Sequence, residues 1–523
     1  MGVCEGDENI NKLHLFAQRN EKQIALLIIL AGALLRLILI GSFPVGLNQD
    51  EASAGYEAWA LMNYGIDRNG TSLPVLFISW GSGQNVLYSY LSMPFVGIFG
   101  LNEFSLRLLS GLLGSGALPI FYLLAKKIRG GGFGLLALLV LAVNPWHIML
   151  SRWALESNLL PFFLLLGIYF LVLSREKPWF LVASAAVFAV SLYSYGTAFI
   201  FLPPFLIMSV LLLIRRGALR PKAFICSLIV FIVIALPIAL CNLINVLGLE
   251  EVRLFGLTLP ILTQTRQAAT TVFGEGGLQA ALGNISSFLR LMWTQSDGLP
   301  WNSIKGFGLF FGIPGLAVAL FGLVGYVYRL VKRRAPAREI FVLFALVASI
   351  IAAFMIDINV NRINMVFIPL IYFQALGLYF IGRLPGKSRS IVFVPTLVIL
   401  CAVFAYNYFT GFQKNLSPYF FEGFGEAIVY ADSLGENGVW ITDKVNAPYI
   451  FVLFYNRIPP REFMDTVTYP YPNSAFRNVT GFGKYRFGGE LPNEGFVYIV
   501  EAGDVGDLRV LERFGNYAVT TLP

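Results

Sequence analysis

Long apolar stretches separated by short polar connections dominate the pattern of hydrophobic and polar positions along this 523-residue chain. As a helix, each stretch is long enough to cross the hydrocarbon core of a bilayer, which is about 30 Å thick. We predict about eleven spans, at 23–43, 106–125, 133–150, 157–174, 178–196, 197–214, 222–243, 307–328, 339–356, 363–382 and 390–409. The polar N-terminal tail (1–22) and the lack of a small-residue cleavage pattern favour a retained first helix over a signal peptide.

Basic residues are distributed unevenly over the connections between these spans. One alternate set of connections carries twenty Lys and Arg, whereas the opposite set, counted without the C-terminal region and Arg107, carries seven. Because short basic loops stay in the cytoplasm, the N-terminus is predicted to be cytoplasmic and the C-terminal region extracytoplasmic. The short apolar segment Val86–Gly100 would break this grouping if it were a span. We therefore predict that it lies on the outer face or dips into it.

Three long polar regions fall on the predicted outer side: loops 44–105 and 244–306, and residues 410–523. Long loops of this kind commonly carry function. The last region contains one helix-like segment and three strand-like segments, at 419–434, 438–442, 496–501 and 517–522. The predicted fold class is therefore an all-α polytopic membrane domain (23–409) followed by a small extracytoplasmic α/β domain.

Composition narrows the possible functions. Hydrophobic residues make up 57% of the chain and charged residues 13%, against about 25% charged in soluble proteins, which excludes an ordinary soluble enzyme. The net charge of +8 comes from short scattered clusters and forms no basic stripe, which argues against nucleic acid as a partner. The four cysteines lack metal-ligand spacing, and two histidines are too few for a typical metal cluster.

Two adjacent carboxylates, Asp50 and Glu51, follow the first predicted span. If a helix begins near Asp50, one carboxylate can project toward a cavity while Tyr56, Trp59 and Ala60 face the bilayer. Asp50 also suits a helix N-cap. A capping residue on a solvated helix face is the alternative interpretation of this pair.

Arg107, Arg152, Arg362 and Glu156 lie at the predicted outer membrane edge. Ionisable groups at such depths are costly and usually face a bundle interior or a cavity. Guanidinium groups match phosphate oxygens in a fork, so arginines near carboxylates favour a phosphate site. Interfacial snorkelling is the alternative for each arginine alone. His147 is more typical of an interfacial residue than of a base.

Four segments together resemble the GT-C superfamily of membrane glycosyltransferases. The similarity is to the branch with protein O-mannosyltransferases, aminoarabinose lipid A transferases and RgtA-type enzymes. The segments are Asp50-Glu51 with the stretch after it, 99–108, 144–156 and 361–369. The resemblance implies a GT-C fold and an inverting transfer from a polyprenyl-phosphate sugar to an acceptor hydroxyl or amine outside the cytoplasm.

Carried over to this chain, the resemblance makes Asp50 the general base, while Glu51 orients it or holds the acceptor. It makes three arginines candidates to neutralise the departing lipid phosphate, namely Arg107, Arg152 and Arg362. Glu156 stands where the family often has Asp, and Gln84 and Asn361 are further candidates. Segment 80–85 lacks the lysine that several relatives carry there, so that donor contact is not carried over.

The partners implied are the lipid-linked sugar donor, an acceptor lipid, glycan or protein, and membrane lipids. The chemistry demands no metal, although Asp50, Glu51 or Glu156 could bind a divalent ion through oxygen. The absence of the extra lumenal domain of protein mannosyltransferases favours a prokaryotic plasma membrane. The main alternative function is a lipid or polysaccharide transporter of the envelope, and a third class is a non-enzymatic receptor or assembly factor.

Overall fold

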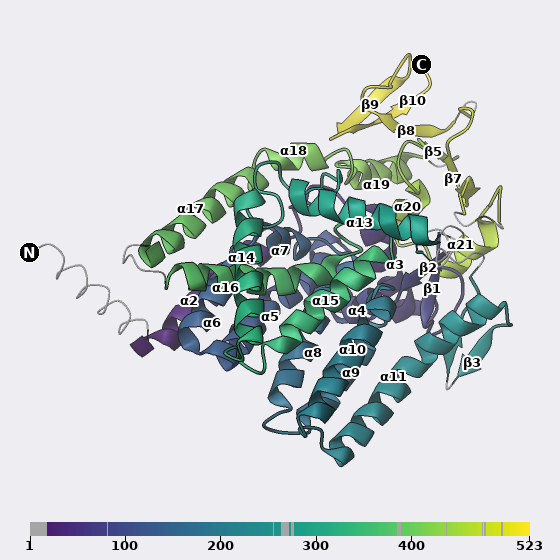
Figure 1. Ribbon diagram of the computed structural model, residues 1–523. Helices are drawn as coiled ribbons and strands as arrows, with labels where there is room; N and C mark the ends of the chain where they lie inside the picture. The colour runs from purple at the N-terminus through teal and green to yellow at the C-terminus, as the bar shows by residue number, and fades with distance from the viewer. Residues whose placement is uncertain are drawn as a thin grey trace, which may run out of the picture.

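The computed structural model describes residues 18–523 except 81, 255, 263–270, 273–276, 384–388, 436, 473, 475–476 and 493–494. In the described residues a helical bundle carries a mixed β-sheet at one end (Figure 1). The bundle contains α2 (Glu21–Leu37), α5 (Glu103–Arg129), α6 (Gly131–Ala142), α7 (Pro145–Leu150), η1 (Glu156–Leu159), α8 (Leu160–Leu173), α9 (Phe180–Ser191), α10 (Ala198–Arg215), α11 (Pro221–Leu247), α14 (Gly312–Val331), α15 (Ile340–Phe354), η2 (Asn364–Val366), α16 (Phe367–Ile381) and α17 (Arg389–Phe409). Every predicted span overlaps one of these helices or an adjoining pair.

Seven helical segments of the described chain are long and apolar enough to cross a membrane: Glu103–Arg129, Glu156–Leu173, Ala198–Arg215, Pro221–Leu247, Gly312–Val331, Asn364–Ile381 and Val392–Phe409. The other predicted spans correspond to shorter helices, so the count of eleven is not established. One predicted span, 133–150, is interrupted. Asn144 caps a new helix by accepting a hydrogen bond from the His147 backbone N–H at 2.9 Å, and Pro145 supplies the first residue of that helix.

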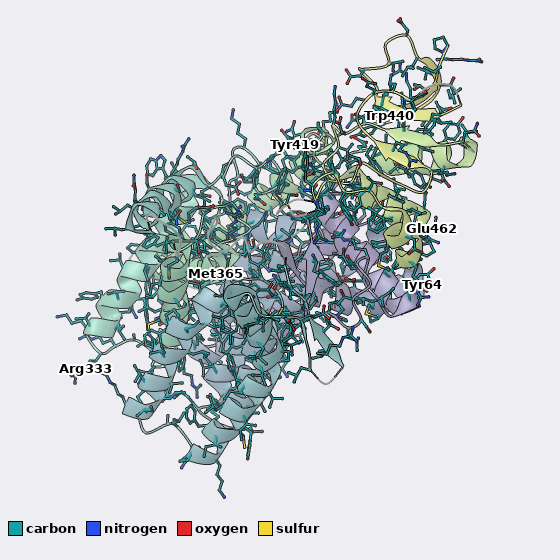
Figure 2. The ribbon with its side chains drawn as sticks, turned by 90° about the vertical axis from the view of Figure 1, so that its right-hand side faces the viewer. Tyr64, Arg333, Met365, Tyr419, Trp440 and Glu462 are labelled. Carbon is teal, nitrogen blue, oxygen red and sulfur yellow. The ribbon has the colours of Figure 1, made fainter. Side chains whose placement is uncertain are left out.

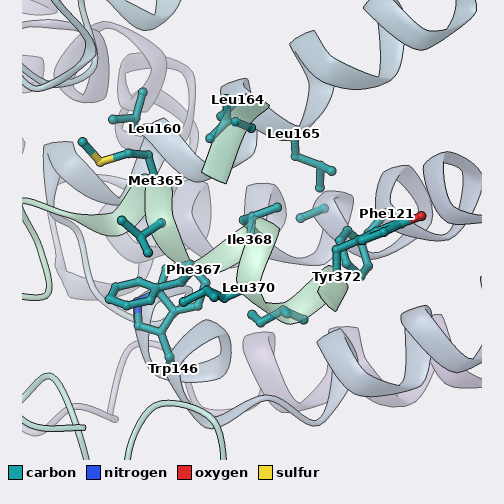
Figure 3. Packing of buried hydrophobic residues seen from close by; sticks show 14 of the residues in the cluster. Phe121, Trp146, Leu160, Leu164, Leu165, Met365, Phe367, Ile368, Leu370 and Tyr372 are labelled. Carbon is teal, nitrogen blue, oxygen red and sulfur yellow. The ribbon is translucent and has the colours of Figure 1, made fainter. Parts of the chain in front are cut away.

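Helix α16 forms the centre of the bundle. Almost every residue of this helix is buried, which is the pattern of a helix surrounded by other helices. Figure 3 shows Phe367 beside Trp146, and Tyr372 beside Phe121, which belong to α7 and α5. Small residues bring α14 close, because a Cβ on Gly377 would stand 2.0 Å from the Val318 carbonyl oxygen. The interior around α16 is therefore mainly apolar and tightly packed.

Basic connections gather at one end of the bundle. Glu176 forms ion pairs with Lys127 at 2.6 Å and with Arg338 at 2.5 Å. Arg216 donates a hydrogen bond to the Ala337 carbonyl oxygen at 2.8 Å. These contacts join four of the connections that the charge pattern grouped as cytoplasmic. Figure 2 shows Arg333 at the opposite end of the molecule from Trp440 of the β-sheet. The grouping is thus confirmed for these connections, while the side of the membrane stays a prediction.

Loop 44–105 contains two helices and a hairpin. They are α3 (Gln49–Tyr64), β1 (Leu76–Ser79), β2 (Ser82–Asn85) and α4 (Leu87–Phe99). The predicted segment 86–100 is therefore helical. The second loop contains β3 (Val252–Leu254), β4 (Leu257–Leu259) and α13 (Gly277–Thr294). A bridge between Pro74 and Thr258 joins the two loops.

The C-terminal region contains α18 (Phe412–Leu416), α19 (Phe424–Leu434), β5 (Val439–Ile441), α20 (Pro448–Asn456), α21 (Pro460–Thr466), β6 (Gly481–Phe482), β7 (Tyr485–Phe487), β8 (Val497–Glu501), β9 (Arg509–Phe514) and β10 (Tyr517–Thr521). Its sheet has the order β6-β7-β5-β8-β10-β9, in which β5 runs parallel to both β7 and β8. The predicted strands 438–442, 496–501 and 517–522 are confirmed as β5, β8 and β10. The predicted helix begins at Phe424, five residues later than expected.

The C-terminal region packs directly on α3. One hydrophobic cluster includes Tyr56 and Ala60 of α3 together with Phe424 and Phe454. The Tyr56 hydroxyl donates to the Ile458 carbonyl oxygen at 2.7 Å. Tyr56 and Ala60 are inaccessible to solvent, so the prediction that they face the bilayer was wrong. They face the C-terminal domain instead.

Candidate active site

Asp50 is the second residue of α3. The prediction that a helix begins here is confirmed, but Asp50 is not its N-cap. Asn48 is the cap, since its side chain accepts the Asp50 backbone N–H at 3.0 Å while Glu51 accepts the Asn48 backbone N–H at 3.1 Å. This capping box leaves the Asp50 carboxylate at the positive end of the helix. Asp50 lines a cavity of about 580 Å³ between α3, the β1–β2 hairpin and the C-terminal domain.

Glu51 points away from that cavity and is inaccessible to solvent. Its two carboxylate oxygens accept a paired set of bonds from Arg107, each at 2.8 Å. The Ala154 backbone N–H adds a further bond at 2.8 Å. The carboxylate is therefore occupied by protein groups, so the geometry favours a positioning role for Glu51 over acceptor binding or metal ligation.

Arg107 has an equally closed environment. Besides Glu51, it donates to the carbonyl oxygens of Pro44 at 2.6 Å and Gly46 at 2.7 Å. Its side chain is fully buried. These contacts anchor the chain between α2 and α3 to α5. They do not support the predicted contact of Arg107 with a donor phosphate.

Arg152 closes the end of α2. It donates to the carbonyl oxygens of Leu35 and Ile38, each at 2.8 Å, and of Phe43 at 3.1 Å. Its guanidinium carbon lies 4.8 Å from the centre of the Phe409 ring. The last carbonyl groups of a helix have no hydrogen-bond partners within the helix, and the Arg152 guanidinium donates to those at the end of α2. Its geometry is that of a buried capping residue, which again does not support a phosphate contact.

Arg362 differs from these two arginines because its side chain is 30% exposed. It pairs with Asp357 at 3.3 Å. It also bonds with Tyr195, whose surroundings include Glu156 and Asp50. Arg362, Tyr195 and Glu156 therefore form a polar cluster beside Asp50.

The remaining predicted site residues lie near this cluster or next to α3. The Glu156 carboxylate accepts the Asn85 backbone N–H at 2.5 Å. Gln84 is buried and accepts a hydrogen bond from Ser53 of α3 at 3.0 Å. Asn361 lines a second, much smaller cavity beside Trp153.

The polar wall of the Asp50 cavity was missed by sequence reasoning. It comes from residues after β5 and before β6, including Asp443, Asn446, Arg477 and Asn478, and from Trp80 of the hairpin. These residues are ordinary polar loop residues in sequence, and only the folded sheet brings them together. The clearest available signal was Trp80 beside glycines in a polar loop.

Two buried arginines outside the cavity were also missed. Arg36 donates to His147 Nδ1 at 2.8 Å inside the bundle, so His147 is an interior residue and not an interfacial one. Arg68 pairs with Glu57 at 3.1 Å and lies 5.1 Å from the Trp80 ring centre and 6.0 Å from that of Tyr449. Arg68 therefore supports the aromatic part of the cavity wall.

Among the residues that the structure describes, no group of three or more His, Cys, Asp or Glu side chains is arranged to hold a metal ion.

Comparison with known proteins shows what this architecture resembles. A family model described as dolichyl-phosphate-mannose-protein mannosyltransferase matches residues 84–240, which include Arg107, Arg152 and Glu156. The crystal structure of ArnT from Cupriavidus metallidurans bound to undecaprenyl phosphate matches with a TM-score of 0.54 and 12% identity, over 95% of this chain and 97% of that chain. The chain therefore shares the fold of these membrane glycosyltransferases, which are members of the GT-C superfamily. The predicted resemblance is thus confirmed.

Other solved structures share this GT-C fold. ArnT from the same organism in its apo state gives a TM-score of 0.54 and 13% identity, over 95% of this chain and 97% of that chain. The apo oligosaccharyltransferase of Archaeoglobus fulgidus gives 0.51 and 14%, over 84% of this chain and 64% of that chain. No curated protein sequence gives a significant match to this chain.

Proposed function

We propose that this GT-C protein is an inverting glycosyltransferase that moves a sugar from a polyprenyl-phosphate donor to an acceptor outside the cytoplasm, with Asp50 as general base. The observation that carries the proposal is the different environments of two adjacent carboxylates, Asp50 and Glu51. The Glu51 carboxylate accepts hydrogen bonds from Arg107 and from two backbone N–H groups. Asp50 lines an open cavity of about 580 Å³, which lies within the usual size range of ligand sites, roughly 300–1,000 Å³.

The Asp50 carboxylate accepts the proton of an acceptor hydroxyl or amine as that group attacks the anomeric carbon of the donor sugar. The bond from that carbon to the phosphate oxygen breaks, and its electron pair leaves with the polyprenyl phosphate. Attack on the side opposite the leaving group inverts the anomeric configuration.

The departing phosphate requires positive charge. Arg362 is the best candidate among the three predicted arginines, because Arg107 and Arg152 are occupied by protein groups. It is partly exposed and belongs to the cluster beside Asp50. The Tyr195 hydroxyl, which belongs to the same cluster, is a second donor. The undecaprenyl phosphate bound to ArnT supports a lipid-phosphate donor here too.

The structure offers less support to the alternative functions. A transporter needs a polar route through the bundle, whereas the centre around α16 is packed with apolar side chains (Figure 3). A receptor or assembly factor has no need for a carboxylate fixed at a helix N-terminus in a cavity. We assign the protein to a prokaryotic plasma membrane, with its N-terminus in the cytoplasm.

The test is transfer of radiolabelled sugar from a panel of polyprenyl-phosphate sugars to acceptors extracted from membranes, by purified wild-type protein and Asp50→Asn. Glu250→Gln, an exposed carboxylate of the second loop, is the matched control. We expect transfer by wild type and Glu250→Gln and a loss of at least about a hundredfold in Asp50→Asn, with unchanged gel-filtration profiles. Equal transfer by Asp50→Asn removes Asp50 from catalysis, and no transfer from any donor contradicts the proposal.

A further inference from the structure

The C-terminal domain contributes most of the wall opposite Asp50. Strands β5 and β7 are parallel, so their carboxyl ends meet at one edge of the sheet. Asp443 follows β5 at this edge, and Gly489 follows β7, and both line the cavity. Open α/β sheets bind ligands outside the carboxyl ends of their parallel strands. The domain therefore presents its ligand-binding edge to the proposed catalytic base.

Close backbone contact shapes this edge. Gly488 has φ of +64°, and a Cβ on it would stand 2.5 Å from an Asp443 carboxylate oxygen. The Trp440 indole N–H donates to the Gly488 carbonyl oxygen at 3.0 Å. The turn after β7 is thus held against the turn after β5. Asp443 is an exposed carboxylate in the wall and lies against Gly488, so it is accessible to a ligand in the cavity.

An aromatic surface stands beside this carboxylate. Trp80 is partly exposed, lines the cavity, and meets the Tyr449 ring edge-to-face at 6.0 Å. Its carbonyl oxygen accepts the Arg477 backbone N–H at 3.2 Å. The buried Arg68 guanidinium lies against both rings. Trp80 is therefore held at the junction of the membrane domain and the C-terminal domain.

The wall combines an aromatic face with short polar side chains. Asn446, Asn478 and Thr480 are exposed and line the cavity together with Asp443. A sugar ring has an apolar C–H face and a rim of hydroxyls that both donate and accept hydrogen bonds. Aromatic rings pack against the C–H face, and carboxylates and amides form hydrogen bonds with the hydroxyls. A purely lipidic ligand would leave these polar groups without partners.

We propose that this wall binds a sugar ring of the acceptor, with Trp80 as the stacking surface and Asp443 as a hydroxyl partner. The proposal rests on the proposed function and assigns it an acceptor class, a glycan or a lipid bearing a sugar. The donor's own sugar is the competing source of the same chemistry. The position of Asp50 favours the acceptor over the donor. Arg362 and Tyr195, the proposed partners of the donor phosphate, belong to the cluster beside Asp50 but do not line the cavity. If Asp50 lies between the two substrates, the donor phosphate is on the side of Arg362 and the acceptor is in the cavity.

The test measures saccharide binding separately from catalysis. Methyl glycosides of mannose, glucose and galactose serve as probes, and saturation-transfer NMR on purified full-length protein detects their binding. We expect dissociation constants on the order of 1 mM for the best probe, corresponding to roughly 4 kcal/mol. Trp80→Ala and Asp443→Asn should weaken binding about tenfold or more, because each removes one of the two recognition elements.

Matched controls separate recognition from general damage. Trp179→Ala and Asp507→Asn remove an exposed tryptophan and an exposed aspartate away from the cavity, and should leave binding unchanged. Melting temperatures show whether each variant folds. If Trp80→Ala fails to fold, Asp443→Asn and the wild-type measurement still decide the result.

Adding an undecaprenyl-phosphate sugar at saturation distinguishes the two sources. Persistent saccharide binding supports an acceptor site, and displacement assigns the wall to the donor and overturns the proposal. No binding of any probe at about a hundred times the expected dissociation constant also overturns it, even where label transfer occurs. Binding without label transfer contradicts the proposed function while leaving the sugar site in place.

Discussion

Arg107 and Glu51 form a two-bond ion pair in which Nε donates to Oε1 and Nη2 donates to Oε2, each at 2.8 Å. Both side chains are fully buried. The pair ties α5 to the first turn of α3, one residue after Asp50. The position of Asp50 is therefore determined inside the protein and not by a surface loop.

Removing one partner of this pair should strongly destabilise the fold. Arg107→Met leaves the Glu51 charge buried without its cation, which typically costs about 3–5 kcal/mol. We expect a large fall in melting temperature, measured in detergent by intrinsic fluorescence. Arg253→Gln is the control, because that side chain is 81% exposed. An Arg107→Met protein that melts like wild type but has lost transfer would instead point to a direct catalytic contact.

Gly46 and Gly65 give a matched pair of backbone tests, because their φ angles are +68° and +70°. A Cβ on Gly46 would stand 2.0 Å from the Phe420 carbonyl oxygen, whereas a Cβ on Gly65 meets nothing within 4 Å. Gly65→Ala should cost about 1 kcal/mol, from left-handed strain alone. Gly46→Ala should cost clearly more, since it also separates the chain before α3 from the C-terminal domain. Equal melting temperatures for the two variants would contradict this account.

Asp67 predicts a pH dependence of stability. Its Oδ1 accepts backbone N–H groups of Asn69 and Thr71, while its buried Oδ2 has no hydrogen-bond partner in the part of the chain that the structure describes. Burial raises the pKa of Asp67 from 3.8 to about 6. The folded state therefore binds a proton more tightly than the unfolded state, and this stabilisation is complete below about pH 4 and lost as the pH rises through about 6.

Asp67→Asn should remove this contribution. The melting temperature of wild type minus that of the variant should fall as the pH rises from about 4 to about 7, by the equivalent of roughly 1–3 kcal/mol. Groups remote from Asp67 titrate alike in both proteins, so the difference reports Asp67 together with its buried neighbour Glu57. A difference that stays constant or grows over this range would show that Asp67 is ionised in the folded state.

Arg362 should matter for turnover more than for stability. Its side chain is 30% exposed and its partner Asp357 is more exposed still, so the ion pair contributes little to folding. If Arg362 neutralises the leaving phosphate, Arg362→Gln should lower sugar transfer by about a hundredfold or more with an unchanged melting temperature. The readout is the rate of label transfer at saturating donor. Unimpaired transfer would remove Arg362 from the reaction.

The helices of the bundle could be predicted from sequence because apolar length alone determines where the chain can cross a bilayer. Asp50 and Glu51 could be recognised as candidate site residues because they are adjacent carboxylates at the expected start of a helix. Their contrasting environments could not be predicted, since they depend on Arg107, more than fifty positions away, and on the Ala154 backbone. Sequence identifies the arginines as costly but does not show which ones already have protein partners.

The wall of the cavity was beyond sequence reasoning for a different reason. Strands of two or three residues, such as β6 and β7, carry too little alternation to be recognised. Most residues of the C-terminal domain that line the cavity lie in the loops after β5 and before β6. Their proximity to Asp50 is a product of strand order and of docking on α3, which no local pattern encodes.

The hydrogen bond from the Tyr56 hydroxyl to the Ile458 carbonyl oxygen, and the shared apolar cluster around it, also determine how such a protein can be re-engineered. Exchanging the C-terminal domain alone between relatives would leave mismatched surfaces on α3 and an unsupported Trp80. A chimera that keeps a complete cavity should exchange residues 44–105 and the C-terminal domain as one unit. Acceptor range and membrane anchoring could then be varied independently.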